Sequence, residues 1–194
     1  MSQEATSNPS ARQVELLEAA YRYALAHGLA ELSLRPLATA IGSSPRVLMF
    51  LFGNKDGLVK ALLARARTDE LGLLDRLRPA GGPPIGLVPA VEQLWTWLAA
   101  DEHRPLLRLW AEAYARSLVE PDGAWAGFAR TTVNDWLDVL AACQTPADRD
   151  GEQGATRRTL ALAVLRGALL DLLATDDTHR TTTAVHHQLA LLRA

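Results

Sequence analysis

The stretch that decides the fold reads Ser33-Leu-Arg-Pro-Leu-Ala-Thr-Ala-Ile-Gly42, then Ser43, then Ser44-Pro-Arg-Val-Leu-Met-Phe-Leu-Phe-Gly53. Ser33 and Ser44 are residues that favour the N-cap position, so each is expected to open a short helix. Proline at the first helical position supports the second start, and Gly42 supplies a sharp turn between the two helices. Two short helices joined by a tight turn are the layout of a helix-turn-helix, and we predict that unit here.

Apolar spacing predicts which faces of these two helices are buried. Leu34, Leu37, Ala38 and Ile41 would pack the first helix, and Val47 or Leu48, with Leu51 and Phe52, would anchor the second. The predicted DNA-binding residues are those left outside or placed at a helix start: Ser33, Arg35, Ser43, Ser44, Arg46, Val47, Met49, Phe50 and Lys55. Arg46 suits a guanine edge or a phosphate, and Lys55 suits a phosphate. The free N–H groups at both helix starts are further phosphate sites.

Helical spacing continues along the chain, whereas alternating strand patterns are nearly absent. A capping box at Ser10–Gln13 opens a first helix that Gly28 closes, and a long fourth helix runs from Asn54 to about Leu77. The segment Arg78–Pro84 is rich in Pro and Gly, so it is predicted to be a loop. Further helices are expected near 86–100, 104–119, 123–143, 154–175 and 179–193. The predicted fold class is therefore all-α, with about nine helices.

Charge divides the chain into two modules. Residues 1–67 hold 8 Lys and Arg against 5 Asp and Glu, whereas residues 68–194 hold 12 against 17. The formal net charge of −2 excludes a wholly basic nucleic-acid coat protein. We predict a helix-turn-helix domain over 1–54, whose residues 1–9 form a flexible arm, and a helical domain over 55–194 that begins with a connecting helix at 55–77.

Several function classes find no support in the sequence. The single cysteine, Cys143, forms no intrachain disulfide, and the N-terminus lacks the apolar core of a signal peptide, so a cytoplasmic protein is expected. The apolar run 160–174 contains Arg166 and Asp171, which makes it too charged to span a membrane and favours a buried ion pair or an interface contact there. No catalytic motif and no metal-ligand cluster is present, so we expect no enzyme activity, no metal site, no cofactor and no membrane partner.

The residues from Ser33 to Leu58, within about 11–62, resemble the N-terminal signature of the TetR family of transcriptional repressors. The most specific matches are the Ala38–Gly42 turn, Leu48, Phe52 and the Asn54-Lys55-Asp56 helix start. The family commonly has tyrosine at the position of Met49 and histidine at that of Leu51. The phosphate contact of that tyrosine is therefore missing, and Phe50 is expected to offer a thymine methyl an apolar contact instead.

The resemblance implies a homodimer whose two recognition helices bind a palindromic DNA operator, spaced by about one helical turn, roughly 34–36 Å. It also implies that a small-molecule effector binds the C-terminal domain and changes that spacing, and that the last two long helices form the dimer interface. The implied interface residues are Ala161, Val164, Leu165, Gly167, Ala168, Leu189 and Leu192.

All five tryptophans lie in the C-terminal domain, where aromatic side chains with a few polar groups are typical of small-molecule pockets. The candidate pocket residues are Trp95, His103, Arg108, Trp110, Tyr114, Asn134 and Trp136. The apolar run Val47–Phe52 leaves open a different function, a small-molecule-sequestering or partner-binding helical protein whose DNA-reading helix has degenerated. An all-α enzyme is a third alternative, supported only by the expected cavity.

Overall fold

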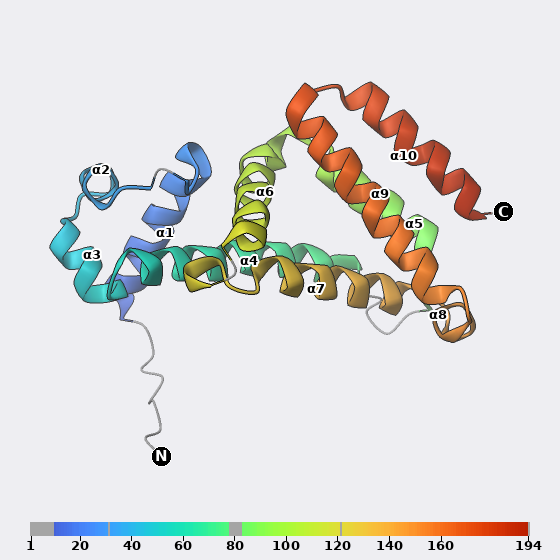
Figure 1. Cartoon of the computed structure of the whole chain (residues 1–194), viewed down its shortest axis with the longest axis horizontal. Helices are drawn as coiled ribbons and strands as arrows, with labels where there is room; N and C mark the ends of the chain where they lie inside the picture. Colours follow the sequence, from blue (N-terminus) through green and yellow to red (C-terminus); the bar gives the residue numbers. More distant parts are fainter. Residues whose placement is uncertain (1–9, 31, 78–82, 121, 194) are drawn as a thin grey trace, which may run out of the picture.

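The computed structural model describes residues 10–30, 32–77, 83–120 and 122–193, and these contain helices and no strand. Figure 1 shows an elongated arrangement, with α1–α3 at one end and α9 and α10 at the other. The helices are α1 (Ala11–His27), α2 (Leu34–Ala40), α3 (Pro45–Phe52), α4 (Lys55–Leu77), α5 (Leu87–Leu98), α6 (Arg104–Val119), α7 (Phe128–Cys143), α8 (Pro146–Asp150), α9 (Gly154–Thr175) and α10 (Thr178–Arg193). Two short 3₁₀ turns, η1 (Asp101–His103) and η2 (Gly123–Trp125), precede α6 and α7.

Local hydrogen bonds explain where the N-terminal helices begin and turn. Ser10 Oγ accepts from Gln13 N–H at 3.2 Å, which caps α1. The Gln13 side chain does not complete the predicted capping box, because its amide donates to the Leu51 carbonyl of α3. Gly42 has a φ of 64°, a left-handed conformation that costs glycine little. The predicted helix-turn-helix is therefore α2, this glycine turn and α3.

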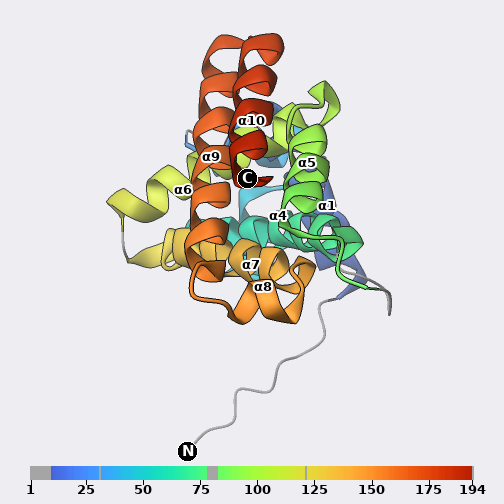
Figure 2. The ribbon, with the colours of Figure 1, turned by 90° about the vertical axis from the view of Figure 1, so that its right-hand side faces the viewer.

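Two hydrophobic cores lie along the molecule, and α4 contributes to both. The first core packs α1–α3 against the N-terminal half of α4, with Leu48 and Leu62 fully buried, and it also includes Leu109 and Ala113 of α6. The second core joins α5, α7, α9 and α10 to the C-terminal half of α4. Figure 2 shows α9 and α10 running side by side, in agreement with their extensive packing contact.

The predicted all-α class is confirmed, and the described residues form ten α-helices, close to the expected number of about nine. The helix expected over 123–143 is divided into η2 and α7, because Ala126 is extended and Gly127 has a φ of 74°. The short helix α8 lies where a connecting segment was expected, and the Thr145 hydroxyl caps it by accepting from Asp148 N–H. The predicted arm at 1–9 and most of the predicted loop at 78–84 lie outside the described residues.

Across the described ranges, none of the helices is long and apolar enough to cross a membrane. The same part of the chain contains no group of three or more His, Cys, Asp or Glu side chains placed to hold a metal ion.

Candidate functional sites

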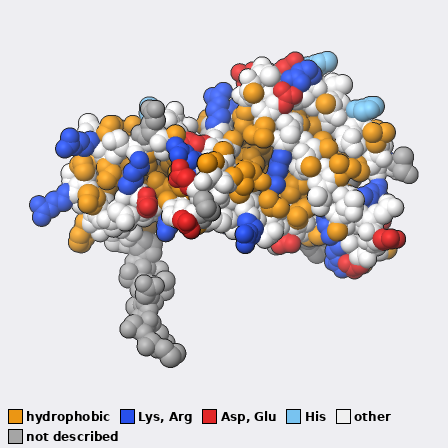
Figure 3. All heavy atoms as spheres, in the orientation of Figure 1, with side chains coloured by type: hydrophobic (Ala, Val, Ile, Leu, Met, Phe, Trp, Pro, Cys, Tyr) orange, Lys and Arg blue, Asp and Glu red, His pale blue; other side chains and the backbone are white. Residues whose placement is uncertain are grey.

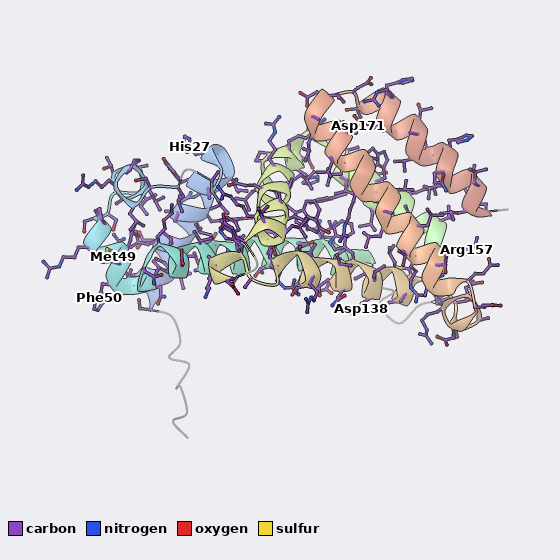
Figure 4. The ribbon with its side chains drawn as sticks, viewed as in Figure 1. His27, Met49, Phe50, Asp138, Arg157 and Asp171 are labelled. Atoms are coloured by element: carbon purple, nitrogen blue, oxygen red, sulfur yellow. The ribbon has the colours of Figure 1, made fainter. Side chains whose placement is uncertain are left out.

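The exposed face of α3 is apolar. Leu48 is buried and anchors the helix, whereas Val47, Met49 and Phe50 point outward. Phe50 is 86% exposed and Met49 is 50% exposed, which is unusual for such large apolar side chains. Figure 4 shows Met49 and Phe50 on α3, at the end of the molecule opposite Arg157. We call Val47, Met49 and Phe50 the reading surface.

Cationic side chains lie around the reading surface. Arg35 on α2, Arg46 on α3 and Lys55 at the start of α4 are all exposed. None of the three has an ion-pair partner among the described residues. Figure 3 shows Lys and Arg side chains projecting at this end of the molecule. Unpaired cations beside an exposed helix are available to bind phosphate groups.

The three predicted serines have different surroundings. Ser44 is exposed, and its hydroxyl caps α3 by accepting from Val47 N–H at 3.3 Å. Ser33 occupies the N-cap position of α2 without a side-chain capping bond. Ser43 is half-buried, and its hydroxyl oxygen is buried without a partner among the described residues. Ser33 and Ser44 are thus accessible to a phosphate, and Ser43 is less so.

Polar contacts connect the helix-turn-helix end to the rest of the chain through α1. The Tyr21 hydroxyl donates to Asp69 of α4 at 2.9 Å, and Arg65 of α4 bonds both Glu18 and Asp69 at 2.5 Å. Burial and the Asp69 bond together raise the pKa of Tyr21 above its usual value.

A second contact ties the end of α1 to α6. The Leu29 N–H donates to Glu112 of α6 at 2.8 Å. The carboxylate approaches closely because Gly28 has no side chain, and a Cβ there would lie 3.1 Å from the same oxygen. The position of α1 is therefore tied to both α4 and α6.

A stripe of apolar and small residues faces outward along α9 and α10. Leu160, Gly167 and Leu170 lie on α9, and Leu191 lies on α10. Leu170 is 53% exposed and Leu191 is 59% exposed, and a Cβ at Gly167 would meet nothing within 4 Å. We call these four residues the α9/α10 surface. It can pack against a similar helical face, because small residues allow helices to approach closely.

The residues implied for dimerisation fall into two sets, and this corrects the sequence-based selection. Ala161, Leu165, Leu189 and Leu192 are buried in the core of their own chain, whereas Gly167 is exposed and Val164 and Ala168 are half-buried. The reason is helical periodicity, since apolar residues on opposite sides of α9 serve the core and the surface. The sequence analysis did not select Leu160, Leu170 and Leu191, because an exposed leucine and a core leucine look alike in sequence.

An apolar pocket lies between α4, α5, α6, α7 and α9. Its volume is about 30 Å³, room for about two water molecules. The aromatic wall residues are Trp97, Trp110, Phe128 and Trp136, and the polar ones are Glu70 and Arg166. A larger ligand therefore requires the surrounding side chains to move apart.

Glu70 is the acidic group of this pocket, and it is almost fully buried. Its Oε1 accepts from Trp136 Nε1 at 2.5 Å, and an Arg67–Asp135 ion pair lies nearby. Burial raises the pKa of Glu70 above its usual value, and the Trp136 hydrogen bond opposes this shift. The neutral form of the Glu70 carboxyl group is therefore favoured more strongly in this pocket than in bulk water.

The structure brings Trp110 and Trp136 together on the pocket, and it places the other candidate pocket residues elsewhere. Trp95 is in the core, where its Nε1 donates to the Thr182 hydroxyl at 3.0 Å. His103 stacks on Trp97 with 3.8 Å between ring centroids, and Tyr114 contacts Trp110 and Arg166 behind the wall. Arg108 and Asn134 are exposed.

Sequence reasoning missed Glu70 as a pocket residue, and it assigned Arg166 to an ion pair or an interface. The signal at Arg166 was present, because a lone arginine interrupts an apolar helix. Nothing in the sequence marks Glu70 as buried, because it is one of several charged residues of α4. Its burial depends on its contact with α7, where Trp136 donates to it.

Comparison with known proteins identifies the N-terminal part of the chain. Residues 16–62 match the model of the bacterial regulatory proteins of the tetR family. None of the curated proteins matches the sequence.

Solved structures share the fold along nearly the whole chain. A transcriptional regulator from Rhodococcus sp. Rha1 is 22% identical, with a TM-score of 0.73 and coverage of 92% of this chain and 94% of its own. A TetR transcription regulator from Haloarcula marismortui is 19% identical, with a TM-score of 0.72 and coverage of 91% and 93%. The multidrug binding protein EbrR, complexed with proflavin, is 24% identical, with a TM-score of 0.64 and coverage of 92% and 99%.

The matched segment includes α2, the turn and α3, and the helices that follow have the arrangement of these regulators. The segment that contains the helix-turn-helix thus resembles the bacterial regulatory proteins of the tetR family, and the chain as a whole shares the all-helical fold of these solved regulators.

Proposed function

We propose that this protein is a homodimeric transcriptional repressor that binds a palindromic DNA operator and is released from it by a small-molecule effector. The observation that carries the proposal is the exposed reading surface with its unpaired cations, at the opposite end of the molecule from the apolar α9/α10 surface. A second copy can dock on α9 and α10 without covering α3. Both recognition helices then remain free for DNA.

DNA binding is assigned to α3 and its neighbours. Arg46 contacts a base edge or a phosphate, and Lys55 and Arg35 contact phosphates. Phe50 and Val47 contact thymine methyl groups, the apolar feature of the major groove. The capped start of α3 at Ser44 supplies backbone N–H groups to another phosphate.

Release is assigned to α4 and α6, which line the pocket and also hold α1. Trp110 and Glu112 lie on α6, and Glu70 and Asp69 lie on α4. A ligand that separates these helices shifts the contacts at Tyr21 and Leu29, and thus the helix-turn-helix. The ligand favours the released state only to the extent that it binds that state more tightly. EbrR, which has the same fold, is a multidrug binding protein solved with proflavin, which supports an effector site in this body.

The test is selection of bound fragments from random DNA with the purified full chain at about physiological salt, followed by sequencing. The proposal expects an enriched palindrome whose half-sites are about one helical turn apart. Charge-dependent binding without any preferred sequence would contradict it and favour the sequestering or partner-binding function, for which the apolar reading surface is the motivating observation.

A further inference from the structure

Two buried nitrogen atoms of pocket residues have no hydrogen-bond partner among the described residues. They are Trp110 Nε1 and Arg166 Nη2. Both are donors only, because neither an indole N–H nor a guanidinium can accept. A buried donor left unpaired destabilises the folded protein, and a charged one does so more strongly. Folded proteins pair most such groups, so these two atoms mark a place where an acceptor from outside the chain would bind.

The two donors belong to one cluster of side chains from α6 and α9. Tyr114 lies between them, with its ring centroid 5.0 Å from that of Trp110 and 5.1 Å from Arg166 Cζ. Arg166 Nη1 donates to the Tyr114 hydroxyl at 3.3 Å, which leaves Nη2 unpaired. Tyr114 therefore contacts both side chains that carry the unpaired donors, and it is not itself among the lining residues of the pocket.

Arg166 differs in its partners from Arg65, Arg67 and Arg104. Arg65, Arg67 and Arg104 each pair with a carboxylate within 4 Å. Among the described residues Arg166 forms no ion pair with a carboxylate, and it donates instead to the neutral hydroxyl of Tyr114. Burial lowers the pKa of Arg166, and the charge of Glu70, which forms no ion pair with Arg166, only partly opposes this shift. An anion is the group that this site lacks.

Glu70 does not make the pocket a cation site. Its Oε1 already accepts from Trp136, and the arginines Arg67 and Arg166 both lie close enough to act on its charge. Burial raises the pKa of Glu70, so this carboxyl group ionises less readily than it would in water. The remaining wall is apolar, including Trp97, Phe128 and Leu169.

We infer that the pocket binds an organic carboxylate with an apolar body, whose carboxylate accepts from Arg166 Nη2 and Trp110 Nε1. The apolar body lies between Trp97, Phe128 and the leucines of the wall, and the wall expands to admit it. The effect of this ligand on DNA binding rests on the proposed function. The ligand would join α6 to α9, and α6 carries Glu112, which accepts from Leu29 N–H at the end of α1. Binding itself is independent of DNA.

The experiment is isothermal titration calorimetry of the full chain, without DNA, against ligands that share a body and differ in their head group. One set is octanoate, octanamide and octylammonium, and the other is 1-naphthoate, 1-naphthamide and 1-naphthylmethylammonium. The carboxylate of at least one set is expected to bind at least about tenfold more tightly than its amide and its ammonium. Tighter binding of the ammonium, or no binding of either carboxylate, would overturn the inference.

Two variants locate the head group. Arg166→Met keeps the length of the side chain and removes its donors, so the affinity for the carboxylate should fall at least about tenfold. Trp110→Phe keeps the aromatic body and removes the N–H, so the loss should be a few-fold, about that of one hydrogen bond. Arg130→Met, on the exposed side of α7, is the matched control. Unchanged affinity in both pocket variants would overturn the assignment, and Trp110→Phe decides it alone if Arg166→Met fails to fold.

A second titration separates this inference from the proposed function. The carboxylate is added to the protein bound to its selected DNA. Binding in calorimetry together with release of DNA supports both proposals. Binding without release overturns the effector role in the proposed function and leaves the carboxylate site supported. Release by the amide or the ammonium, without calorimetric binding of either carboxylate, supports the effector role and overturns the carboxylate site.

Discussion

The reading surface and the α9/α10 surface are both exposed and apolar, but their charged neighbours differ. Arg35, Arg46 and Lys55 beside the reading surface have no carboxylate partner among the described residues. Beside the α9/α10 surface, Arg180 bonds both oxygens of Asp171 at 2.7 Å. Unpaired cations attract a polyanion, whereas charges already paired within the chain leave an apolar face free to meet another apolar face. Exposed apolar area alone does not identify a partner, and the surrounding charges distinguish DNA from a second copy.

The concentration of salt should affect binding at the two surfaces differently, and this is the largest of the expected effects. If each copy contacts phosphates through Arg35, Arg46 and Lys55, raising salt from about 50 to about 200 mM should weaken operator binding by about 10³-fold. The α9/α10 contact is apolar, so the dimer fraction should change little. Fluorescence anisotropy of labelled operator and analytical ultracentrifugation measure the two quantities. Equal salt dependence of both equilibria would contradict the distinction.

Leu170→Arg should break the α9/α10 surface and leave the reading surface intact. The substitution places a charge in an apolar interface, so the protein should become monomeric. Loss of the linked second half-site should weaken operator binding by about 100-fold. Light scattering with size-exclusion chromatography reports the mass. Leu118→Arg on α6 is the control, because that leucine is also well exposed and lies outside both surfaces. A dimeric Leu170→Arg protein would remove this helix face from the interface.

Arg46→Ala and Phe50→Ala should separate the contribution of the apolar reading surface from that of the cations beside it. Arg46→Ala should weaken specific binding by about 1–3 kcal/mol if the guanidinium reads a base. Phe50→Ala should cost about 1 kcal/mol on operators with thymine at the contacted position, and replacing that thymine by uracil should remove the difference.

The dimer fraction should remain unchanged in both of these variants. Arg130→Ala provides the control for loss of an exposed cation far from α3. Operator affinity unchanged by Arg46→Ala would leave that side chain without a role in base readout. A Phe50→Ala effect that persists on the uracil operator would exclude the methyl contact.

The sequence predicted the helix-turn-helix because local signals determine it. Ser44, Gly42 and Leu48 act through capping, turn geometry and helical spacing, all within a few residues. The break at Gly127 was missed because glycine ends some helices and continues others, and the packing of η2 against α4 and α6 decides between the two.

The pocket could be predicted only in part, since it is made by residues distant in the sequence. The sequence analysis selected Trp110 and Trp136, which line the pocket, but it selected Trp95 in place of Trp97, because spacing on one helix does not show which of the two faces the core. The pocket residue Glu70 depends on a contact 66 positions away, and the unpaired state of Arg166 depends on which carboxylates the fold leaves out of reach. The spacing of residues along one helix reveals neither the contact of Glu70 with Trp136 nor the lack of a carboxylate partner for Arg166. The same limit explains why the sequence selected buried leucines for the dimer interface.

Glu70→Gln should alter the interior while both surfaces keep their behaviour, and it is the smallest of the expected effects. The folded-state pKa of Glu70 is raised, so the folded protein holds this proton to higher pH than the unfolded chain. The stabilisation that this proton provides is complete below the unfolded pKa of about 4.3 and is lost as pH rises through the folded-state value. Glutamine stays neutral and keeps an acceptor for Trp136 Nε1, so the variant should gain stability relative to the parent as pH rises.

Urea denaturation of both proteins between about pH 4 and about pH 8 measures this difference in unfolding free energy. Arg67, Asp135 and Arg166 also face Glu70, but they are present in both proteins and their direct contributions largely cancel in the comparison. Glu152→Gln is the control, because that carboxylate is exposed to water in the folded state as well. A difference that stays constant with pH would mean that Glu70 ionises in the folded protein as it does in the unfolded chain. Operator affinity and dimer mass should match the parent at every pH, because neither the unpaired cations around α3 nor the leucines of α9 and α10 contact this carboxylate.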